Sequence, residues 1–421
     1  MPPRFSVVIP TFNRSDLFPY TVQSILNQTF EDFEIILSDN CSSDDTQEVA
    51  RQFKDPRFKY VRTPRHFTIA DSCEFVRMQA SGRSIILLSD DDAFVNSALE
   101  RFAAEAGDFD ADLLFSSVAE YRNPSYPGPD KNTFSCPRFS GSSRVVSADE
   151  FVRPLFSLRP KFSMHPSGFV FPKKIADYVE SRTGRFFWTN GVEYSAWPIC
   201  ALLAKRIVHI DLPLAILGRT AKSYGVNIAL CNPGKERIQE FIKDVDHERK
   251  HAPLNNFTMC NLMAEGILAA KSLFPEEFES YEFDELEYLR KTLAELRRRQ
   301  ALGVDVSTEM DDLRRYAAKY PGFDSTELPP RSPATQRLAR QLRSVIGDLG
   351  ARSLRRRLQA SQLARRLERG PVQSGFYAYG EDFGFFDVLG CAEFLSRCTK
   401  TNSNTAKMTT HQYYDSISAR L

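Results

Sequence analysis

The sequence predicts an α/β protein, in which helices cover a mostly parallel sheet, followed by a mainly α-helical C-terminal region. Over the first 90 residues, short apolar runs rich in β-branched residues alternate with segments of helical spacing. This alternation is typical of parallel strands joined by right-handed crossover helices. Polar residues follow three of the apolar runs directly, as expected where strands end at the ligand-binding edge of such a sheet. After residue 232 the pattern becomes helical, which predicts the C-terminal region.

The first expected strand covers residues 7–9, because this run of valine and isoleucine is stopped by Pro10. Such a run suits a central strand that is buried on both faces. A helix is expected over 17–28, where residues that can face a core recur at helical spacing. We expect Ser15 or Asp16 to cap its N-terminus.

The same unit repeats along the next sixty residues. Strands are expected at 33–37, 58–61 and 84–88, and helices at 46–53 and 71–80. With the first unit, this makes a β-α-β-α-β-α-β order.

Polar segments follow three of these strands, at 10–13, 38–40 and 90–92. The carboxyl ends of parallel strands meet at one edge of a sheet, so we expect the three segments to form one ligand crevice.

Residues 108–225 mix strands with loops rich in proline, glycine and serine. Strands are expected at 113–118, 169–171 and 207–210, and the longest loop at 123–141. This part is expected to complete the same domain.

Composition excludes several classes of protein. The 421 residues are 42% hydrophobic and 26% charged, a balance typical of globular proteins and not of disordered or fibrous chains. The net charge of +1 provides no global field for nucleic-acid binding. The eight cysteines form no C-x-x-C pair, so we expect reduced thiols. The first residues lack the apolar core of a signal peptide, and no apolar stretch approaches the ~18 residues of a membrane span, so a cytoplasmic location is expected.

Asp90, Asp91 and Asp92 are consecutive carboxylates at a predicted strand end. Like charges about 4 Å apart repel by ~1 kcal/mol even in water, so the three side chains need a cation nearby. Mg²⁺ or Mn²⁺ is commonly held by one or two carboxylates together with phosphate oxygens. Alternatively, the three residues cap a helix over 93–105, whose dipole favours acidic residues at its start. The residues alone leave both interpretations open.

Four motifs in order resemble successive signatures of family 2 inverting glycosyltransferases with the GT-A fold, a Rossmann-like fold of nucleotide-diphospho-sugar transferases. They are VVIPTFNR at 7–14, SILNQTF at 24–30, EIILSDNCSSDDT at 34–46 and ASGRSIILLSDDD at 80–92. The resemblance is strong over 1–105 and weaker up to residue 225. It implies a domain over 1–230, with a nucleotide-binding half at 1–105 and an acceptor half at 106–230. The helical pattern after this domain predicts a separate helical region at 231–330.

The resemblance also implies a donor site for a nucleotide-diphospho-sugar. Its residues would be Pro10, Thr11, Asn13, Asp39, Asp90, Asp91, Asp92 and Arg219. Pro10 and Thr11 would present backbone groups to the base, and Asp39 would accept a hydrogen bond from it. Asp92 would bind Mn²⁺ or Mg²⁺ directly, with Asp90 as the other member of a D-x-D pair. The metal would bridge the diphosphate and stabilise it as a leaving group.

An inverting transfer needs a base on the acceptor side, and the resemblance implies Glu193 for this role. The segment TNGVEYSAW at 189–197 is similar to a G-E-D-Y-like segment of the family, with Glu193 at the position of the aspartate. A surface or salt-bridged glutamate is the alternative. Trp188 and Trp197 flank Glu193 and would either stack on a sugar acceptor or pack in the core.

Two further segments leave alternatives open. Where many relatives have an A-R-N segment, residues 69–75 read IADSCEF. Asp71 or Glu74 would therefore either replace donor contacts or cap the helix. The polar loop at 219–223 would either close over the diphosphate or stay solvated.

The segment HERKH at 247–251 matches the H-E-x-x-H zinc motif. Its charged neighbours and Pro253, which ends the helix expected over 235–251, favour a solvated helix face instead. Another helix is expected at 257–273, followed by a charged stretch at 278–300.

Residues 331–370 contain eleven arginines and two acidic residues, a local charge of +9. A leucine-rich stripe through them predicts basic amphipathic helices. Because aromatic residues are not interleaved, we expect no nucleic acid but contact with an anionic membrane surface or a partner. Packing on the acidic remainder of the protein is the alternative. The segment 371–421 begins with an aromatic cluster, and its polar end is expected to be mobile.

These observations lead to the expectation of a metal-dependent inverting glycosyltransferase. It would move a sugar to a hydroxyl group of a glycan or lipid-linked acceptor in surface polysaccharide or glycoconjugate synthesis, at the inner face of the membrane. The alternative is a non-catalytic sugar-nucleotide-binding or scaffold protein, which the departures at 69–75 and at Glu193 motivate.

Overall fold

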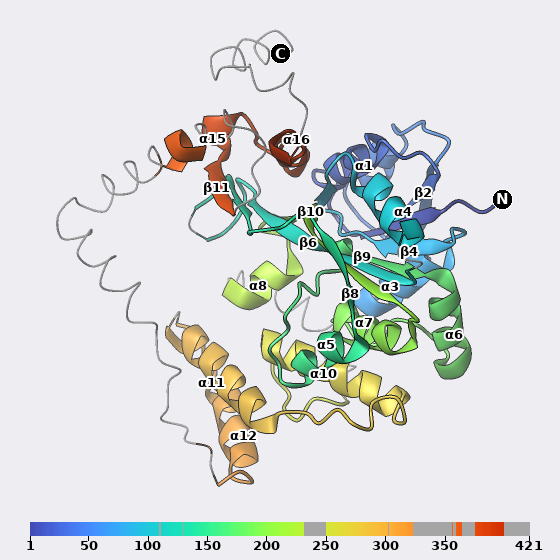
Figure 1. The fold of residues 1–421 in the computed structure, drawn as a ribbon. Helices are drawn as coiled ribbons and strands as arrows, with labels where there is room; N and C mark the ends of the chain where they lie inside the picture. Colours follow the sequence, from blue (N-terminus) through green and yellow to red (C-terminus); the bar gives the residue numbers. More distant parts are fainter. Residues whose placement is uncertain are drawn as a thin grey trace.

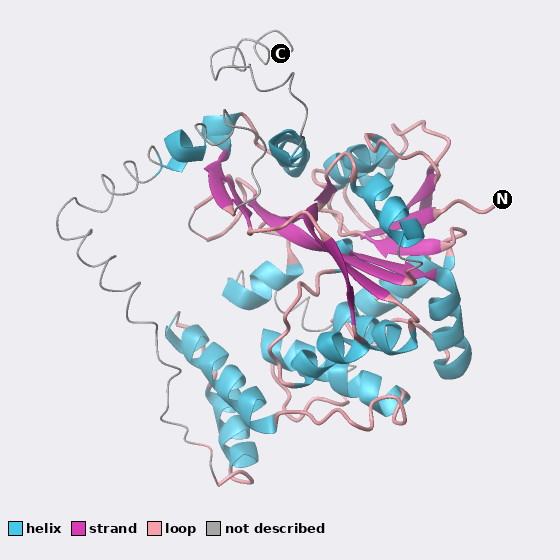
Figure 2. Ribbon diagram, viewed as in Figure 1, coloured by secondary structure: helices cyan, strands magenta, loops and turns pink. Residues whose placement is uncertain are grey.

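The structure, a computed structural model, describes residues 1–108, 111–128, 130–230, 250–301, 303–321, 323, 356, 359–363 and 375–399. A large mixed sheet lies between two layers of helices, and further helices follow it in the chain (Figures 1 and 2). The elements up to the first long loop are β1 (Phe5–Thr11), α1 (Phe18–Leu26), β2 (Phe33–Asp39), α2 (Thr46–Ala50), β3 (Phe58–Arg62), α3 (Ile69–Met78), β4 (Ser84–Leu87), β5 (Ala93–Phe94), α4 (Ala98–Asp108) and β6 (Leu113–Arg122).

The second part of the sheet domain alternates less regularly. Its elements are β7 (Thr133–Cys136), β8 (Ser143–Val146), α5 (Ala148–Phe156), the 3₁₀ turn η1 (Pro166–Gly168), β9 (Phe169–Pro172), α6 (Lys173–Thr183), α7 (Val192–Leu203), β10 (Ile207–Arg219) and α8 (Tyr224–Leu230). The C-terminal elements are α10 (Met259–Leu273), α11 (Glu285–Ala301), α12 (Ser307–Ala317), β11 (Phe376–Tyr379), α15 (Gly380–Phe383) and α16 (Val388–Thr399).

The strand order explains where a crevice forms. The main path through the eleven-stranded sheet is β11-β7-β6-β9-β4-β1-β2-β3, and β10 pairs with β5, β6 and β8. β1, β2, β3 and β4 run parallel, whereas β9 pairs antiparallel with both β4 and β6. The carboxyl ends of β1, β2 and β4 therefore lie side by side at one edge.

Alternation along the strands divides the apolar residues between two cores. In β1, Val7 and Ile9 pack with α1, α4 and α16, while Val8 packs with α3, α5 and α7. Successive strand residues point to opposite faces, so one continuous apolar run supplies both cores. This confirms the predicted α/β class with helices on both faces of the sheet.

The C-terminal region is largely helical, as predicted. α10 packs on α7, α11 on α10, and α12 on α11, so these helices extend the core on one face of the sheet. β11 is a strand that the sequence did not predict. It pairs antiparallel with β7, and α16 packs against α1, β5 and β10 on the other face (Figure 1).

Several local expectations need correction. α1 begins at Phe18 after Leu17, with Pro19 in its first turn and no side-chain cap, so the predicted cap by Ser15 or Asp16 is wrong. A proline near the helix start has no N–H to satisfy, which reduces the need for such a cap. The expected loop at 123–141 contains β7.

Some expectations fall on residues that the structure does not describe. These are most of the basic stretch 331–370, the polar tail 400–421, and most of the helix expected over 235–251. Among the described helices, none combines the length and the apolar character that crossing a membrane requires.

Candidate functional site

The polar strand ends meet as the parallel sheet predicts. Thr11 and Asp39 are register partners at the ends of β1 and β2, and the three aspartates follow β4 on the other side of β1. The Thr11 hydroxyl donates to Asp90 Oδ2 at 2.7 Å. Thr11, one of the predicted donor-site residues, thus uses its side chain to hold the acidic segment.

A half-buried arginine lies beside the buried aspartates. Asp90 is 4% exposed, Asp91 6% and Asp92 1%. Arg14 Nη1 lies 2.5 Å from Asp90 Oδ1 and 3.5 Å from Asp91 Oδ2. Burial raises the pKa of Asp90, although the charge of Arg14 opposes this shift. Burial also acts to lower the pKa of Arg14, but the neighbouring carboxylates outweigh burial and the pKa of Arg14 is raised. Arg14 therefore compensates part of the repulsion that the sequence indicated.

Asp92 has a different set of partners. Gly218 N donates to its Oδ1 at 2.8 Å, the Ser167 hydroxyl donates to its Oδ2, and His165 Nδ1 lies 3.4 Å from the same oxygen. Burial, and then the charge of Asp91, raise the pKa of Asp92 well above its usual value. In the part of the chain that the structure describes, no lysine or arginine forms an ion pair with Asp92.

The helix-cap interpretation of the aspartates is wrong. β5 follows Asp92 directly and pairs with β10, and α4 begins only at Ala98. The first turn of α4 is six residues away in sequence, so its dipole does not account for three adjacent carboxylates.

Asp92 and His165 fit a divalent cation. Burial, and then the charge of Arg219, lower the pKa of His165 to about 3, so its imidazole is neutral. Its Nδ1 is buried and has no hydrogen-bond partner. An unpartnered imidazole nitrogen beside a carboxylate is a pair of ligand types that Mn²⁺ accepts. No cluster of three or more histidine, cysteine or acidic side chains suited to a metal occurs among the described residues. Phosphate oxygens would therefore have to complete the coordination.

Asp39 is fully buried and both of its carboxylate oxygens are occupied. Oδ1 accepts from Ser42 N at 2.7 Å, and Oδ2 accepts from Tyr60 Oη at 2.7 Å and Arg62 Nη1 at 2.6 Å. Burial and the hydrogen bond to Asp39 raise the pKa of Tyr60 to about 12. A contact between Asp39 and a nucleotide base stays a prediction.

Pro10 and Asn13 lie at the start of the same crevice and are half-buried. Asn13 has a φ of 53° and its Oδ1 accepts from Ser43 N at 2.8 Å. The left-handed conformation, which asparagine tolerates better than most residues, lets Asn13 join the loops after β1 and β2. Contacts of Pro10 and Asn13 with a nucleotide stay predictions.

The loop after β10 lies over the aspartates. The Ser223 hydroxyl donates to Asp91 Oδ2 at 2.5 Å, and Arg14 Nη2 donates to the carbonyl oxygen of Lys222 at 2.6 Å. Arg219 Nε lies 3.1 Å from Glu120 Oε2. The interpretation of 219–223 as a freely solvated loop is therefore wrong. Whether Arg219 binds a diphosphate stays a prediction.

Glu193 lies in the first turn of α7. Burial raises its pKa to about 7, and its own backbone N–H opposes the shift only in part. Among the described residues no ion pair involves Glu193, so the salt-bridged alternative is not observed there. A carboxyl group with a pKa near 7 has the property that a general base needs.

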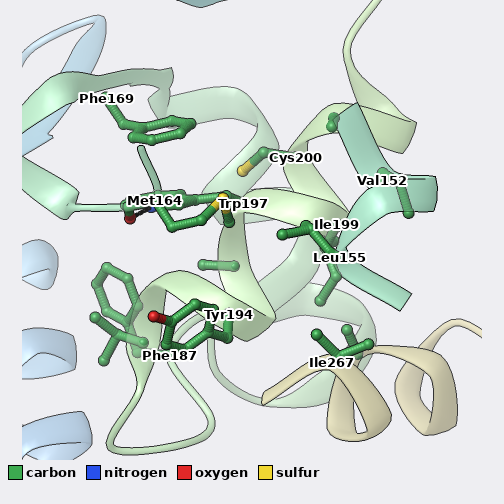
Figure 3. Close-up of a cluster of buried hydrophobic side chains, with 14 of the residues drawn as sticks. Val152, Leu155, Met164, Phe169, Phe187, Tyr194, Trp197, Ile199, Cys200 and Ile267 are labelled. Atoms are coloured by element: carbon green, nitrogen blue, oxygen red, sulfur yellow. Dashed lines mark hydrogen bonds between the residues drawn. The ribbon is translucent and has the colours of Figure 1, made fainter. Parts of the chain in front are cut away.

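Trp197 packs in the core and does not face a sugar. It is 0% exposed and stacks on Phe169 with ring centroids 4.9 Å apart (Figure 3). Its Nε1 donates to the carbonyl oxygen of Met164 at 3.1 Å. The sugar-stacking interpretation is therefore wrong for Trp197. Trp188 is half-buried and donates to the carbonyl oxygen of Arg185 at 3.0 Å.

The segment 164–167 links the two ends of the site. Trp197 of α7 holds it at Met164, and Asp92 holds it at Ser167. α7, which carries Glu193, is thus joined to the acidic segment through four residues.

Sequence reasoning missed the contacts of Arg14, Ser167 and Gly218 with the aspartates. Arg14 lies in the first sequence motif, at 7–14, and this position was a signal that it belongs to the site. Ser167 and Gly218 lie 75 and 126 positions from Asp92, and no local pattern connects them to it. Of the H-E-x-x-H segment, 247–249 lie outside the described residues, and His251 N donates to Glu265 Oε2 at 3.0 Å.

Comparisons with known proteins identify similar sequences. The model of the family described as Glycosyl transferase family 2 matches residues 6–175. A GalNAc(5)-diNAcBac-PP-undecaprenol beta-1,3-glucosyltransferase of Campylobacter jejuni is 38% identical over 121 residues, which are 28% of this chain and 39% of that protein. A UDP-Glc:alpha-D-GlcNAc-diphosphoundecaprenol beta-1,3-glucosyltransferase of Escherichia coli is 32% identical over 94 residues, which are 22% of this chain and 38% of that protein. The matched segments thus cover less than two fifths of either relative.

A solved structure is similar at lower identity. The crystal structure of S. aureus TarS 1-349 in complex with UDP-GlcNAc is 16% identical, and the match covers 75% of this chain and 91% of that chain with a TM-score of 0.44.

Proposed function

We propose that this chain, whose residues 6–175 belong to glycosyl transferase family 2, is a metal-dependent inverting glycosyltransferase. It would transfer a sugar from a nucleotide-diphospho-sugar to a hydroxyl group of an acceptor. One observation carries the proposal. A buried aspartate without a lysine or arginine ion pair among the described residues contacts one end of the segment 164–167. The helix α7, which carries a glutamate whose pKa is about 7, contacts the other end through Trp197.

The donor half of the site would lie at the ends of β1, β2 and β4. Asp92, with His165 beside it, would hold Mn²⁺ or Mg²⁺. The bound cation would supply charge stabilisation to the departing nucleoside diphosphate. Arg14 holds Asp90 and Asp91 in place and orients them, while Gly218 N and Ser167 fix the direction of the Asp92 carboxylate.

Glu193 would take the proton from the acceptor hydroxyl. Its pKa of about 7 leaves a substantial fraction of the carboxylate at neutral pH and still makes it a stronger base than an ordinary glutamate. An attack from the acceptor side, opposite the leaving diphosphate, would invert the sugar carbon. In this proposal, residues 1–105 would be the nucleotide-binding half and 106–230 the acceptor half.

The acceptor would be a lipid-linked glycan in surface polysaccharide or glycoconjugate synthesis. The two relatives are named for undecaprenol-linked acceptors, and one for UDP-Glc as donor. The protein would then work at the inner face of a membrane, and the basic stretch 331–370 is our candidate for the contact with it.

The test is calorimetric binding of UDP, GDP and dTDP to the whole chain, with and without manganese, for the wild type and Asp92→Asn. We expect one nucleotide to bind in a manganese-dependent way. The variant, which has lost the anionic ligand, should bind at least about tenfold more weakly and without a metal effect. If none of the nucleotides binds, the scaffold alternative is favoured, and equal binding by the variant would exclude Asp92 as the metal ligand.

A further inference from the structure

The segment 185–190, which leads into α7, is attached to α3 along its length. The contacts, in chain order, are Arg185 Nη2 to Asp71 Oδ1 at 2.7 Å, Phe186 N to Glu74 Oε2 at 3.2 Å, Phe187 N to Glu74 Oε2 at 3.0 Å, and Ala70 N to Asn190 Oδ1 at 3.1 Å. The residues 69–75 were the segment in which this chain departs from the resembling family. α3 is capped by the side chain of Thr68, so neither Asp71 nor Glu74 serves as its cap.

Glu74 is the centre of these contacts because both of its carboxylate oxygens are used. Oε2 accepts the two consecutive backbone N–H groups, and Oε1 accepts from Arg77 Nη2 at 2.5 Å. Arg77 is 2% exposed and also reaches Glu180 Oε2 at 2.6 Å. A buried arginine that pairs with Glu74, Glu180 and, at 3.8 Å, Asp177 fixes the direction of the Glu74 carboxylate.

The other side of the same segment is packed against the core below α7. Phe186 and Phe187 are both fully buried, and their rings lie 5.1 Å and 6.5 Å from that of Phe171. Phe187 also contacts Trp197 of α7, with centroids 6.5 Å apart (Figure 3). The backbone that precedes Glu193 is therefore held between α3 and the core.

α3 also approaches Glu193 itself. After burial, the charge of Glu193 is the next largest cause of the raised pKa of Cys73, the residue before Glu74. The pKa of Tyr194 is also raised, first by burial and then by the charge of Glu193. Cys73 on α3 and Tyr194 on α7 are thus two titratable neighbours of Glu193.

We propose that Glu74 is a positioning residue that sets the place of Glu193 by holding the backbone of Phe186 and Phe187. This inference rests on the proposed role of Glu193 as the base. A carboxylate is needed at position 74 because it has enough acceptor sites for two N–H groups and a guanidinium at once. A glutamine has one acceptor oxygen, and its NH₂ group would face donors.

The test compares Glu74→Gln with Glu74→Asp and with the control Glu180→Gln. The control removes the other close carboxylate of Arg77 but leaves the N–H groups of 186 and 187 paired. Three quantities are measured on the full chain: amide hydrogen exchange over 185–193, manganese-dependent binding of UDP-glucose, and the rate of UDP release from UDP-glucose as a function of pH. A displacement of about 1 Å at a reacting group lowers a rate by up to about 10²-fold.

We expect Glu74→Gln to speed exchange over 185–193, to lower the rate of UDP release about 10- to 10²-fold, and to leave UDP-glucose binding within about twofold. Its rate profile should shift along the pH axis, and Glu74→Asp should recover part of the rate. Glu180→Gln should match the wild type in exchange over 185–193. The proposal is overturned if hydrogen exchange over 185–193 is unchanged in Glu74→Gln. It is also overturned if Glu74→Gln and Glu180→Gln lower the rate of UDP release by the same factor.

The inference and the proposed function fail in different ways. A Glu193→Gln variant that keeps the wild-type rate would reject Glu193 as the base, whatever happens at Glu74. A Glu193→Gln variant that loses the rate, beside a Glu74→Gln variant that keeps it, would reject only the positioning role.

Discussion

At the scale of single residues, burial determines the chemistry of the candidate site. Burial raises the pKa of Glu193 to about 7 and lowers the pKa of His165 to about 3. Desolvation disfavours the charged form in both cases. The carboxyl group of Glu193 therefore stays protonated up to a higher pH, and the imidazole of His165 stays neutral. In our proposal, Glu193 would accept a proton and His165 would donate a lone pair to a metal.

Glu193→Gln is expected to lower the transfer rate by at least about 10²-fold, because a glutamine accepts no proton from the acceptor. Donor binding should be unchanged. In the wild type, the carboxylate is the active form, so the rate should rise with pH through about 7 and level off above it. Steady-state rates between pH 5 and 9 check this. A wild-type rate without a rise near pH 7 would contradict the assignment.

Stability provides an independent check on Glu193. The pKa of Glu193 in the folded state lies above the usual 4.5. Its favourable contribution to the free energy of unfolding is therefore complete below pH 4.5 and is lost as the pH rises through about 7. Glutamine does not ionise. The variant should therefore be more stable than the wild type at pH 8 and similar to it at pH 4.5, as measured by thermal unfolding.

At the scale of elements, the approach of β10 to the aspartates depends on Gly218. A Cβ atom at this position would lie 1.8 Å from the carbonyl oxygen of Asp91. The close approach is what allows Gly218 N to donate to Asp92. The glycine is therefore needed for contact between two backbones, and β10 could not hold the acidic segment without it.

Gly218→Ala is expected to separate β10 from the acidic segment. Since the overlap is with backbone atoms and not with a movable side chain, we expect a loss of at least about 2 kcal/mol in the free energy of unfolding. Manganese-dependent nucleotide binding should be lost as well. Urea unfolding and calorimetry measure the two effects.

Gly107→Ala is the matched control, because a Cβ atom there meets nothing within 4 Å and the residue lies in α4. This exchange should be neutral or stabilise the protein by up to about 1 kcal/mol. If Gly218→Ala behaves like Gly107→Ala, β10 tolerates displacement and the close contact has no role.

At the scale of the whole molecule, the end of the described chain completes the sheet domain. β11 pairs with β7, and Phe394 of α16 lies 6.2 Å from Phe134 and 5.3 Å from Phe385, measured between ring centroids. Residues 260 positions apart thus share one core. The stability of the sheet domain should therefore depend on a segment far from β7 in sequence.

Phe394→Ala is expected to lower the free energy of unfolding by about 3–5 kcal/mol, because a buried ring is removed and a cavity remains. Urea unfolding measures the change. Phe386→Ala, at a residue that is 58% exposed, should change it by no more than about 0.5 kcal/mol. Similar effects of the two variants would mean that α16 is not part of the cooperative unit.

The sequence alone determined the features that depend on near neighbours. Alternating apolar runs predicted the parallel strands β1 to β4 and the helices between them, because side-chain periodicity is a local property. The polar residues after the strands predicted where the crevice lies, and the resemblance of its motifs predicted the family.

Only the tertiary structure decided which groups meet there. Four sets of contacts join residues that the chain separates by 75 to 126 positions: Arg14 as the cation of two aspartates, Ser167 and Gly218 on Asp92, and Glu74 on the backbone before α7. The burial of Trp197 and the pairing of β11 with β7 belong to the same group. Such contacts depend on how elements pack, and a linear pattern does not encode the distance between two residues that no periodicity connects.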